Sequence, residues 1–500
     1  MNLETRKTDS PTFKCLIERL PPEIMYNIFD YLDHESRKSA SLACRRWEQI
    51  YSNYCTKRFA LCNYETLRFG LHFFTSRVCK DAASMLKHTQ RPYHKVHLHL
   101  FFGANALMPV DDEVATVLSE LFKPRWLQQL VVLKLGMRVY PEKFTVELSD
   151  AVAKMDHLQE LDLSLMRCTK DWPLFSQLKL KNATLDKLKV HGVWSGVIDC
   201  PNLRSLELEF PLHNEYKQYL LHQGEEPCWS MKQLQELCIR GGLSFREQEN
   251  KVVDLSTGME QFCKLMPQIK RLYFDDFIVS ERLLRIICES FVHLESLMLH
   301  ILKMDDPNAL RHLEKLPNLR DFGIWDIAGS HAMSFASVCL PKLEKLLLGW
   351  LKYDYERMPK LHPMGKTSFR WRLIRSSPVI DDIDKSLKHL RFLWVDLHLI
   401  NDHLLTKFSQ ISTLETLVLE NVDQKESVLA VPFLKQLKRL VLYCCEDFDP
   451  STIKGVFAKR VPNVKSIKVI FKTPSYGKLC MDYSNEAVQK VNYFPSPMIE

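Results

Sequence analysis

Long apolar runs are missing from this chain of 500 residues. No segment approaches the roughly 18 uninterrupted apolar residues that a membrane-spanning helix requires. The opening segment Met1–Lys7 is polar, so it lacks the apolar core of a secretory signal. These absences predict a protein without a membrane association, resident in the cytosol, the nucleus or both.

Catalytic and metal-binding motifs are also missing. The chain has no His-Glu-x-x-His zinc motif, no Gly-x-Ser-x-Gly elbow and no kinase motif set. His94, His97 and His99 lie close in sequence, but no further ligands with zinc spacing follow, so a solvated strand face is the better interpretation. We therefore expect no metal site, no cofactor and no catalytic residue in this chain.

Cysteine and charge are present without a diagnostic pattern. The 15 cysteines are scattered with no Cys-x-x-Cys, which favours free, buried thiols in a reducing compartment. The net charge of +7 is mild and both signs are interspersed, so nucleic-acid binding is disfavoured while acidic partners are slightly favoured. The apolar fraction of 46% and the charged fraction of 26% are those of an ordinary globular protein.

Near the N-terminus the pattern predicts short helices. Pro21 and Pro22 suit a helix entry, where the missing amide donors would be unpaired, and Glu23 lies where the helix dipole favours a negative charge. Apolar residues then share a helix face: Ile24, Ile28 and Leu32, widened by Met25 and Phe29. A second apolar set is Leu42, Trp47 and Ile50. Because so short a module buries little surface by itself, some of these side chains should remain available to a partner.

This segment, residues 18–52, resembles the F-box family. The matching residues are Leu20, Pro21, Glu23, Ile24, Ile28, Leu32, Leu42, Cys44, Arg45, Arg46 and Trp47. The resemblance implies binding to a Skp-family adaptor and, through it, to the cullin of a ubiquitin ligase. The adaptor-binding residues that it implies are Leu20, Pro21, Ile24, Ile28, Leu32, Leu42 and Trp47. The chain departs from the family at Ser36–Lys38, where a leucine is usual, and at Ala43, where a valine is usual.

From about residue 127 onward the phrase Leu-x-x-Leu-x-Leu recurs, mostly at steps of about 23–28 residues. The copies, named by their first residue, begin at Leu130, Leu158, Leu185, Leu203, Leu234, Ile269, Leu294, Leu319, Leu343, Leu390, Leu414, Leu437 and Val464. Tyr93 begins a candidate earlier copy. The last two apolar positions alternate, so they point to one side of a short strand, and stacked copies would share an interior. Ser280 and Ser451 are candidate N-caps of return helices, and prolines such as Pro201 and Pro317 should lead the chain into the strands.

The repeated phrase is similar to that of leucine-rich-repeat proteins, which implies an α/β fold. We expect a helical F-box followed by a leucine-rich-repeat solenoid, with a curved parallel sheet on the concave face and helices and turns on the convex face. The predicted organisation is a flexible N-terminus (1–17), the F-box (18–52), a helical linker or cap (53–126), the solenoid (127–472) and a C-terminal tail or cap (473–500). The long step at 350–385 fits either a degraded repeat or a projecting loop.

Residues between the buried positions of each phrase should face the concave side. Aromatic residues at these positions, Tyr273, Trp325, Trp394 and Tyr443, are the candidate client-binding residues, because Trp and Tyr are favoured interface anchors. Partial cover by neighbouring strands is an equally good interpretation. Together these features predict a non-catalytic substrate receptor of an SCF-type ubiquitin ligase that holds a protein client. The alternative is a plain leucine-rich-repeat scaffold whose N-terminal helices only cap the repeats.

Overall fold

The chain forms a mixed α/β structure with a helical N-terminal region and extensive parallel sheet. The computed structural model describes residues 20–58, 60–63, 75–89, 92–100, 111–137, 142–165, 179–192, 197–210, 231–241, 259–260, 263, 266–303, 306, 308–328, 335, 338–348, 388–396, 408–422, 434–444, 463–473, 477–482 and 489–491. It divides into two compact units: unit 1 comprises residues 1–173 with 177–185, and unit 2 comprises residues 174–176 with 186–500.

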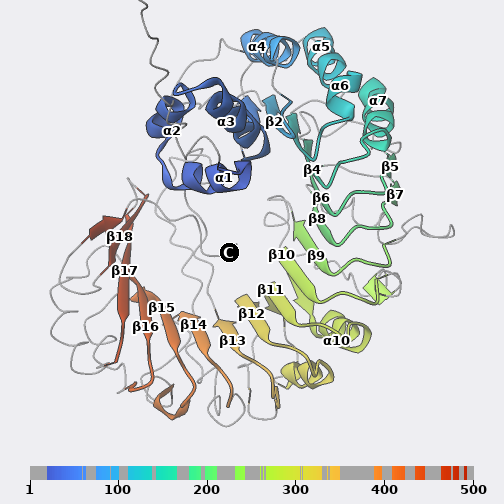
Figure 1. The fold of residues 1–500 in the computed structure, drawn as a ribbon. Coiled ribbons are helices and arrows are strands. Elements are labelled where there is room, and N and C mark those ends of the chain that lie inside the picture. Colours follow the sequence, from blue (N-terminus) through green and yellow to red (C-terminus); the bar gives the residue numbers. More distant parts are fainter. Residues whose placement is uncertain are drawn as a thin grey trace, which may run out of the picture. The chain divides into compact units, whose positions relative to one another are not determined.

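Unit 1 combines helices with a small parallel sheet (Figure 1). Its helices are α1 (Pro22–Tyr31), α2 (His34–Ser41), α3 (Arg45–Arg58), α4 (Thr75–His88), α5 (Asp111–Leu121), α6 (Pro124–Leu127) and α7 (Glu142–Ala153). Its strands are β1 (Leu61–Asn63), β2 (Lys95–Leu100), β3 (Val132–Met137), β4 (Glu160–Leu165) and β5 (Lys179–Lys181). Strands β1 to β4 pair in parallel and in chain order, and α4 packs against α5 and β2.

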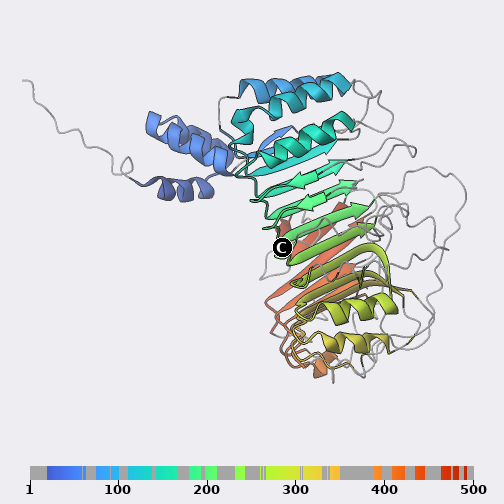
Figure 2. The same cartoon turned by 90° about the vertical axis from the view of Figure 1, so that its right-hand side faces the viewer.

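Unit 2 is dominated by strands that lie side by side (Figure 1). They are β6 (Lys187–Gly192), β7 (Val197–Asp199), β8 (Ser205–Phe210), β9 (Glu236–Gly241), β10 (Arg271–Ser280), β11 (Ser296–Lys303), β12 (Asp321–Ala328), β13 (Lys345–Leu348), β14 (Phe392–Asp396), β15 (Thr416–Val422), β16 (Arg439–Cys444), β17 (Ser466–Thr473), β18 (Gly477–Asp482) and β19 (Gln489–Val491). Described helical segments are α10 (Glu281–Ser290) and the 3-10 segments η3 (Ala309–Lys315) and η5 (Phe408–Gln410). Helix α10 packs beside η3 and β10 (Figure 2).

The repeated phrase sets the register of the parallel strands. Leu237 on β9 pairs with Leu272 on β10, which pairs in turn with Leu297 on β11, and the same rule extends to β17. Leucine therefore lies beside leucine, or an apolar equivalent, along the ladder, and these side chains are buried from β9 to β16. Because successive strand residues point to opposite faces, this alternation makes one face of each sheet apolar interior. The predicted alternation of buried positions is confirmed.

A tight turn precedes most of these strands. The amide of Leu203 donates to the carbonyl of Cys200 over 3.0 Å, and the amide of Leu319 donates to that of Leu316 over 3.1 Å. Pro201 and Pro317 thus occupy the second position of four-residue turns, where the fixed φ of proline fits. These prolines shape the turn into the strand.

Several sequence-based expectations have outcomes here. The helix predicted after Ser280 is α10, and Ser280 Oγ accepts from the amide of Leu283 over 3.3 Å as its N-cap. The candidate copy at Tyr93 is strand β2. The interval 53–126 is not wholly helical, because it contains β1 and β2, whose apolar residues join the sheet. The C-terminal interval 473–500 contributes β18, which pairs antiparallel with β17, and β19, which pairs antiparallel with β18.

Other expectations fall outside the described residues: the N-terminus 1–17, the insertion 350–385 and the candidate cap Ser451. Within the described part of the chain, no helix combines the length and apolarity needed to cross a bilayer.

Candidate functional site

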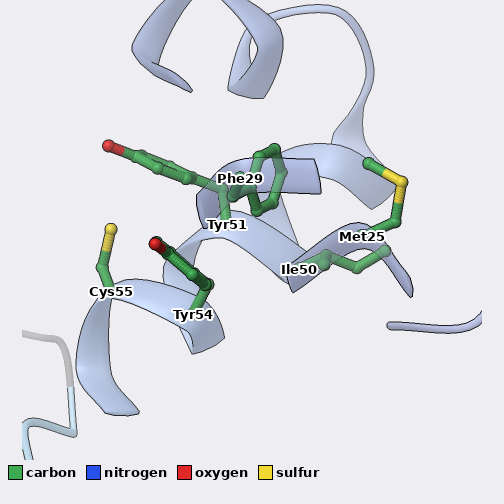
Figure 3. Close-up of a cluster of buried hydrophobic side chains, with 6 residues drawn as sticks. All are labelled: Met25, Phe29, Ile50, Tyr51, Tyr54 and Cys55. Carbon is green, nitrogen blue, oxygen red and sulfur yellow. The ribbon is translucent and has the colours of Figure 1, made fainter. Parts of the chain in front are cut away.

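Helices α1 and α3 share a small aromatic core. Met25 and Phe29 of α1 lie one turn apart and are completely buried against Ile50, Tyr51 and Tyr54 of α3 (Figure 3). The ring of Phe29 meets those of Tyr51 and Tyr54 edge-on, each with centroids 5.4 Å apart. Tyr54 also donates its hydroxyl hydrogen to Asp30 Oδ1 over 2.8 Å. This core fixes which face of α1 points inward.

The neighbouring face of α1 is directed outward and is also apolar. Ile24 is 45% exposed and Tyr31 is 90% exposed, while Ile28 between them is half-buried and contacts the edge of the core. Residues 24, 28 and 31 follow the i, i+4, i+7 spacing of one helix stripe. When a partner covers an apolar stripe of this kind on a small helical module, the free energy of the complex is lowered.

The turn between α1 and α2 is held by polar contacts. Asp33 Oδ1 accepts from the amide of Ser36 over 2.7 Å and caps α2. This hydrogen bond, the largest contribution, lowers the pKa of the Asp33 carboxyl. Arg37 Nε donates to the carbonyl of Phe29 over 2.6 Å, and its guanidinium lies 6.0 Å from the ring centre of Tyr54.

Arg37 therefore stands near the position where the F-box pattern has a leucine, and it contacts the end of α1. It adds a second donor to the carbonyl of Phe29, which also accepts from the amide of Leu32 over 3.3 Å at the end of α1. The departure of Ser36–Lys38 from the family pattern thus removes apolar area from α2 while it secures the end of α1.

The predicted adaptor-binding residues divide into two groups. Ile24, Leu42 and Pro21 are exposed, and Leu42 is 79% exposed at the end of α2. The others, Leu20, Ile28, Leu32 and Trp47, are half-buried and contact the core. Arg46 donates to the carbonyl of Leu20 over 2.7 Å, which ties the entry of α1 to α3. Tyr31 was not singled out from the sequence, although its i+7 spacing from Ile24 would have found it.

The candidate client-binding aromatics have a different outcome. Trp394 and Tyr443 are only 7% and 5% exposed, so for these two the interpretation of cover by neighbouring strands holds and that of exposed anchors does not. Their rings stack 5.5 Å apart across β14 and β16, and with Val418 and Val441 they form an apolar cluster. Tyr273 on β10 is half-buried, and the side chain of Trp325 lies outside what the structure describes. Client binding by these residues stays a prediction.

A buried carboxylate lies on β8, between the neighbouring strands β6 and β9. Glu207 lies 2.8 Å from Lys189 Nζ and 3.9 Å from His191 Nε2. Arg240 Nε is 3.0 Å from it but off the hydrogen-bond axis, so this contact is mainly one of charge. Burial alone would raise the pKa of Glu207, but the Lys189 hydrogen bond and the nearby positive charges outweigh it and lower the pKa.

The described side chains of His94 and His97 contact other groups in the chain. His94 Nδ1 lies 2.9 Å from the carbonyl of Gln129, and His97 Nδ1 lies 3.7 Å from Cys62 Sγ. Among the described residues, no three potential metal-ligating side chains come together. Nine described cysteines are free thiols, and burial, the main cause, raises the pKa of Cys263 and of Cys288 to about 12.

Three short helices with a tight core and an apolar outer stripe define a small helical docking module. Residues 17–58 match the family model described as F-box-like, so the chain carries an F-box-like domain. The match confirms the resemblance drawn over residues 18–52. F-box domains generally bind Skp-family adaptors.

Other comparisons add little. No curated protein matches the chain. One matching solved structure is a crystal structure of a Bacteroides fragilis protein, at 14% identity and a TM-score of 0.29, covering 45% of this chain and 68% of that one. A TM-score this low carries no argument.

Proposed function

We propose that this protein is the substrate-recognition subunit of an SCF-type ubiquitin ligase. Its F-box-like domain binds a Skp-family adaptor and, through the adaptor, the cullin. Its strand-rich remainder holds a protein client beside the transfer machinery, which raises the client's effective concentration there. The chain supplies no catalytic residue or cofactor of its own, and it works in the cytosol, the nucleus or both.

The observation that carries this proposal is the division of α1 into two apolar faces. Met25 and Phe29 satisfy the module's own core, so Ile24 and Tyr31 are not needed for folding. Exposed Leu42, the residue just after α2, is likewise unused by the core cluster. Apolar side chains that serve no internal packing are explained by a partner that covers them.

The test is co-precipitation of the full chain with a Skp-family adaptor. We expect Ile24→Asp with Leu42→Asp to weaken adaptor binding at least tenfold, since each buried aliphatic side chain contributes about 1–2 kcal/mol. Ile28→Asp is less suitable because Ile28 also contacts the core. Arg37→Ala should act differently, by loosening the end of α1.

Val292→Asp is the matched control, because Val292 is 45% exposed, as Ile24 is, but lies after helix α10. It should leave adaptor binding unchanged. Equal adaptor recovery with the double variant and the wild type would refute docking through α1 and α2.

We further propose that the parallel strands form a leucine-rich-repeat solenoid. Two facts support this: each described copy of the phrase supplies one strand, and successive strands pair in register. The client is then held by the face opposite the leucine interior or by the edges of the sheet. Affinity purification with ligase turnover blocked is the experiment that would identify it.

The rival function is a scaffold without a ligase. The polar run Ser36–Lys38 and the inward bracing by Arg37 favour it, because both reduce the apolar area of α2. Under that hypothesis the wild-type chain fails to recover the adaptor at all, which separates the two functions.

A further inference from the structure

A pocket of about 690 Å³ lies in unit 2 along the edge where the strands begin. It is formed by the turns that lead into β12, β13, β14, β15 and β16, which lie side by side (Figure 1). The residue immediately before each of these strands contributes to its lining: Arg320, Glu344, Arg391, Glu415 and Lys438. These five residues form a ladder of charges one strand apart.

Positive charge exceeds negative charge in this lining. The permanent cations are Arg320, Lys342, Arg391 and Lys438, against two carboxylates, Glu344 and Glu415. His389 also lines the pocket. The lining therefore carries a formal surplus of two positive charges before His389 is considered.

Each end of the ladder holds two cations and one carboxylate, but the cations are paired less closely at one end. The carboxylate of Glu415 pairs with two cations, Arg391 at 2.8 Å and Lys438 at 3.1 Å. The hydrogen bond from Arg391 is the main cause of the lowered pKa of Glu415. At the other end, Arg320 is 4.0 Å from Glu344, and Lys342 donates to the neutral amide oxygen of Asn318 over 2.7 Å. Arg320 and Lys342 thus have the weakest compensation by carboxylates.

We propose that this pocket binds an acidic peptide segment of the client, one rich in Asp and Glu, with Arg320 and Lys342 as its main contacts. The proposal rests on the proposed function only in taking the peptide to be the client's. The pairs that line the pocket are solvent-exposed and hold little free energy, so a ligand carboxylate can replace them at small cost. Backbone-anchored turns fix the positions: Thr413 Oγ1 donates to the carbonyl of Leu390 over 2.8 Å, and Gln436 Nε2 donates to that of Ile411 over 2.8 Å.

A peptide fits this lining better than a nucleic acid. A phosphate backbone is bound through runs of cations, whereas Glu344 and Glu415 interrupt the cations here. Proteins also bind single-stranded nucleic acid through aromatic side chains that stack on bases, and the described lining contains no Phe, Tyr or Trp.

The experiment measures fluorescence polarisation of a labelled peptide of alternating Glu and Ser, titrated with the full chain. We expect saturable binding that weakens as salt rises and that is absent for the matched Gln–Ser peptide. Arg320→Gln with Lys342→Gln should weaken binding about tenfold. Glu415→Gln should tighten it about threefold, because it removes a negative charge and frees two cations.

The matched control is Arg204→Gln with Lys232→Gln, which removes the same charge from the same edge outside the pocket: Arg204 immediately precedes β8 and Lys232 lies in the turn before β9. Equal weakening by both double variants, absence of binding to the wild type, or full competition by a single-stranded oligonucleotide would each overturn the proposal. Because Ile24→Asp with Leu42→Asp should bind this peptide normally, failure of the adaptor docking is distinguished from failure of the pocket.

Discussion

At the residue scale, the most constrained charge in the described structure is Glu207. Its side chain is 11% exposed, yet its carboxylate is kept ionised by the cations Lys189 and Arg240 on neighbouring strands. A buried carboxylate of this kind is tolerable only because the cations offset the loss of hydration. Removing the carboxylate would leave those cations close together without compensation.

We predict that Glu207→Gln lowers the free energy of unfolding by about 1–3 kcal/mol at pH 7. The pKa of Glu207 is lowered in the folded protein, so its stabilisation is present above the unfolded pKa and is lost as pH falls through the folded pKa. The difference between variant and wild type should therefore shrink in acid. Urea unfolding at pH 7 and near pH 3 measures it, with Glu295→Gln, an exposed partner of Lys270, as the control. A deficit of equal size at both pH values would contradict this account.

At the scale of the element, helix α10 shows how a local signal fixes a boundary. Ser280 ends β10 and caps α10, while Leu283, Leu284 and Ile287 of the helix are completely or almost completely buried. The cap and the apolar face lie in one stretch of sequence, so this helix could be predicted.

Ser280→Ala should cost about 1 kcal/mol of stability, because the amide of Leu283 loses its side-chain partner. Ser280→Thr keeps the hydroxyl and should remain close to the wild type. Urea midpoints, with hydrogen exchange at the first turn of α10, provide the measurement. If the alanine and threonine variants lose the same stability, the cap contributes nothing.

The strands could likewise be predicted from sequence, because each phrase carries its own alternation of buried and exposed positions. The orientation of α1 could not. Ile24, Met25, Ile28 and Phe29 form two adjacent apolar stripes, and only the aromatic side chains of α3 decide that Met25 and Phe29 face inward. The sequence left the burial of Trp394 as one of two interpretations, because its stacking partner Tyr443 is 49 positions away in sequence (443 minus 394) and on a different strand. Long-range packing, and not local propensity, decides both the orientation of α1 and the burial of Trp394.

At the scale of the whole molecule, the two proposed binding surfaces belong to different compact units. The docking residues Ile24 and Leu42 lie in unit 1, and the pocket residues Arg320 and Lys342 lie in unit 2. Under the proposed function, the protein needs no conformational signal between these units, since a receptor would act by bringing client and adaptor together.

We therefore predict that adaptor and acidic peptide bind without coupling. The Kd of the full chain for the Glu–Ser peptide should change less than about twofold when a Skp-family adaptor is present at saturation, and the converse must hold because binding linkage is reciprocal. Titration with and without the adaptor measures this, and the Ile24→Asp with Leu42→Asp variant is the control in which the adaptor has no effect. A change of tenfold or more would show that the two units communicate, which would replace simple proximity by an allosteric mechanism.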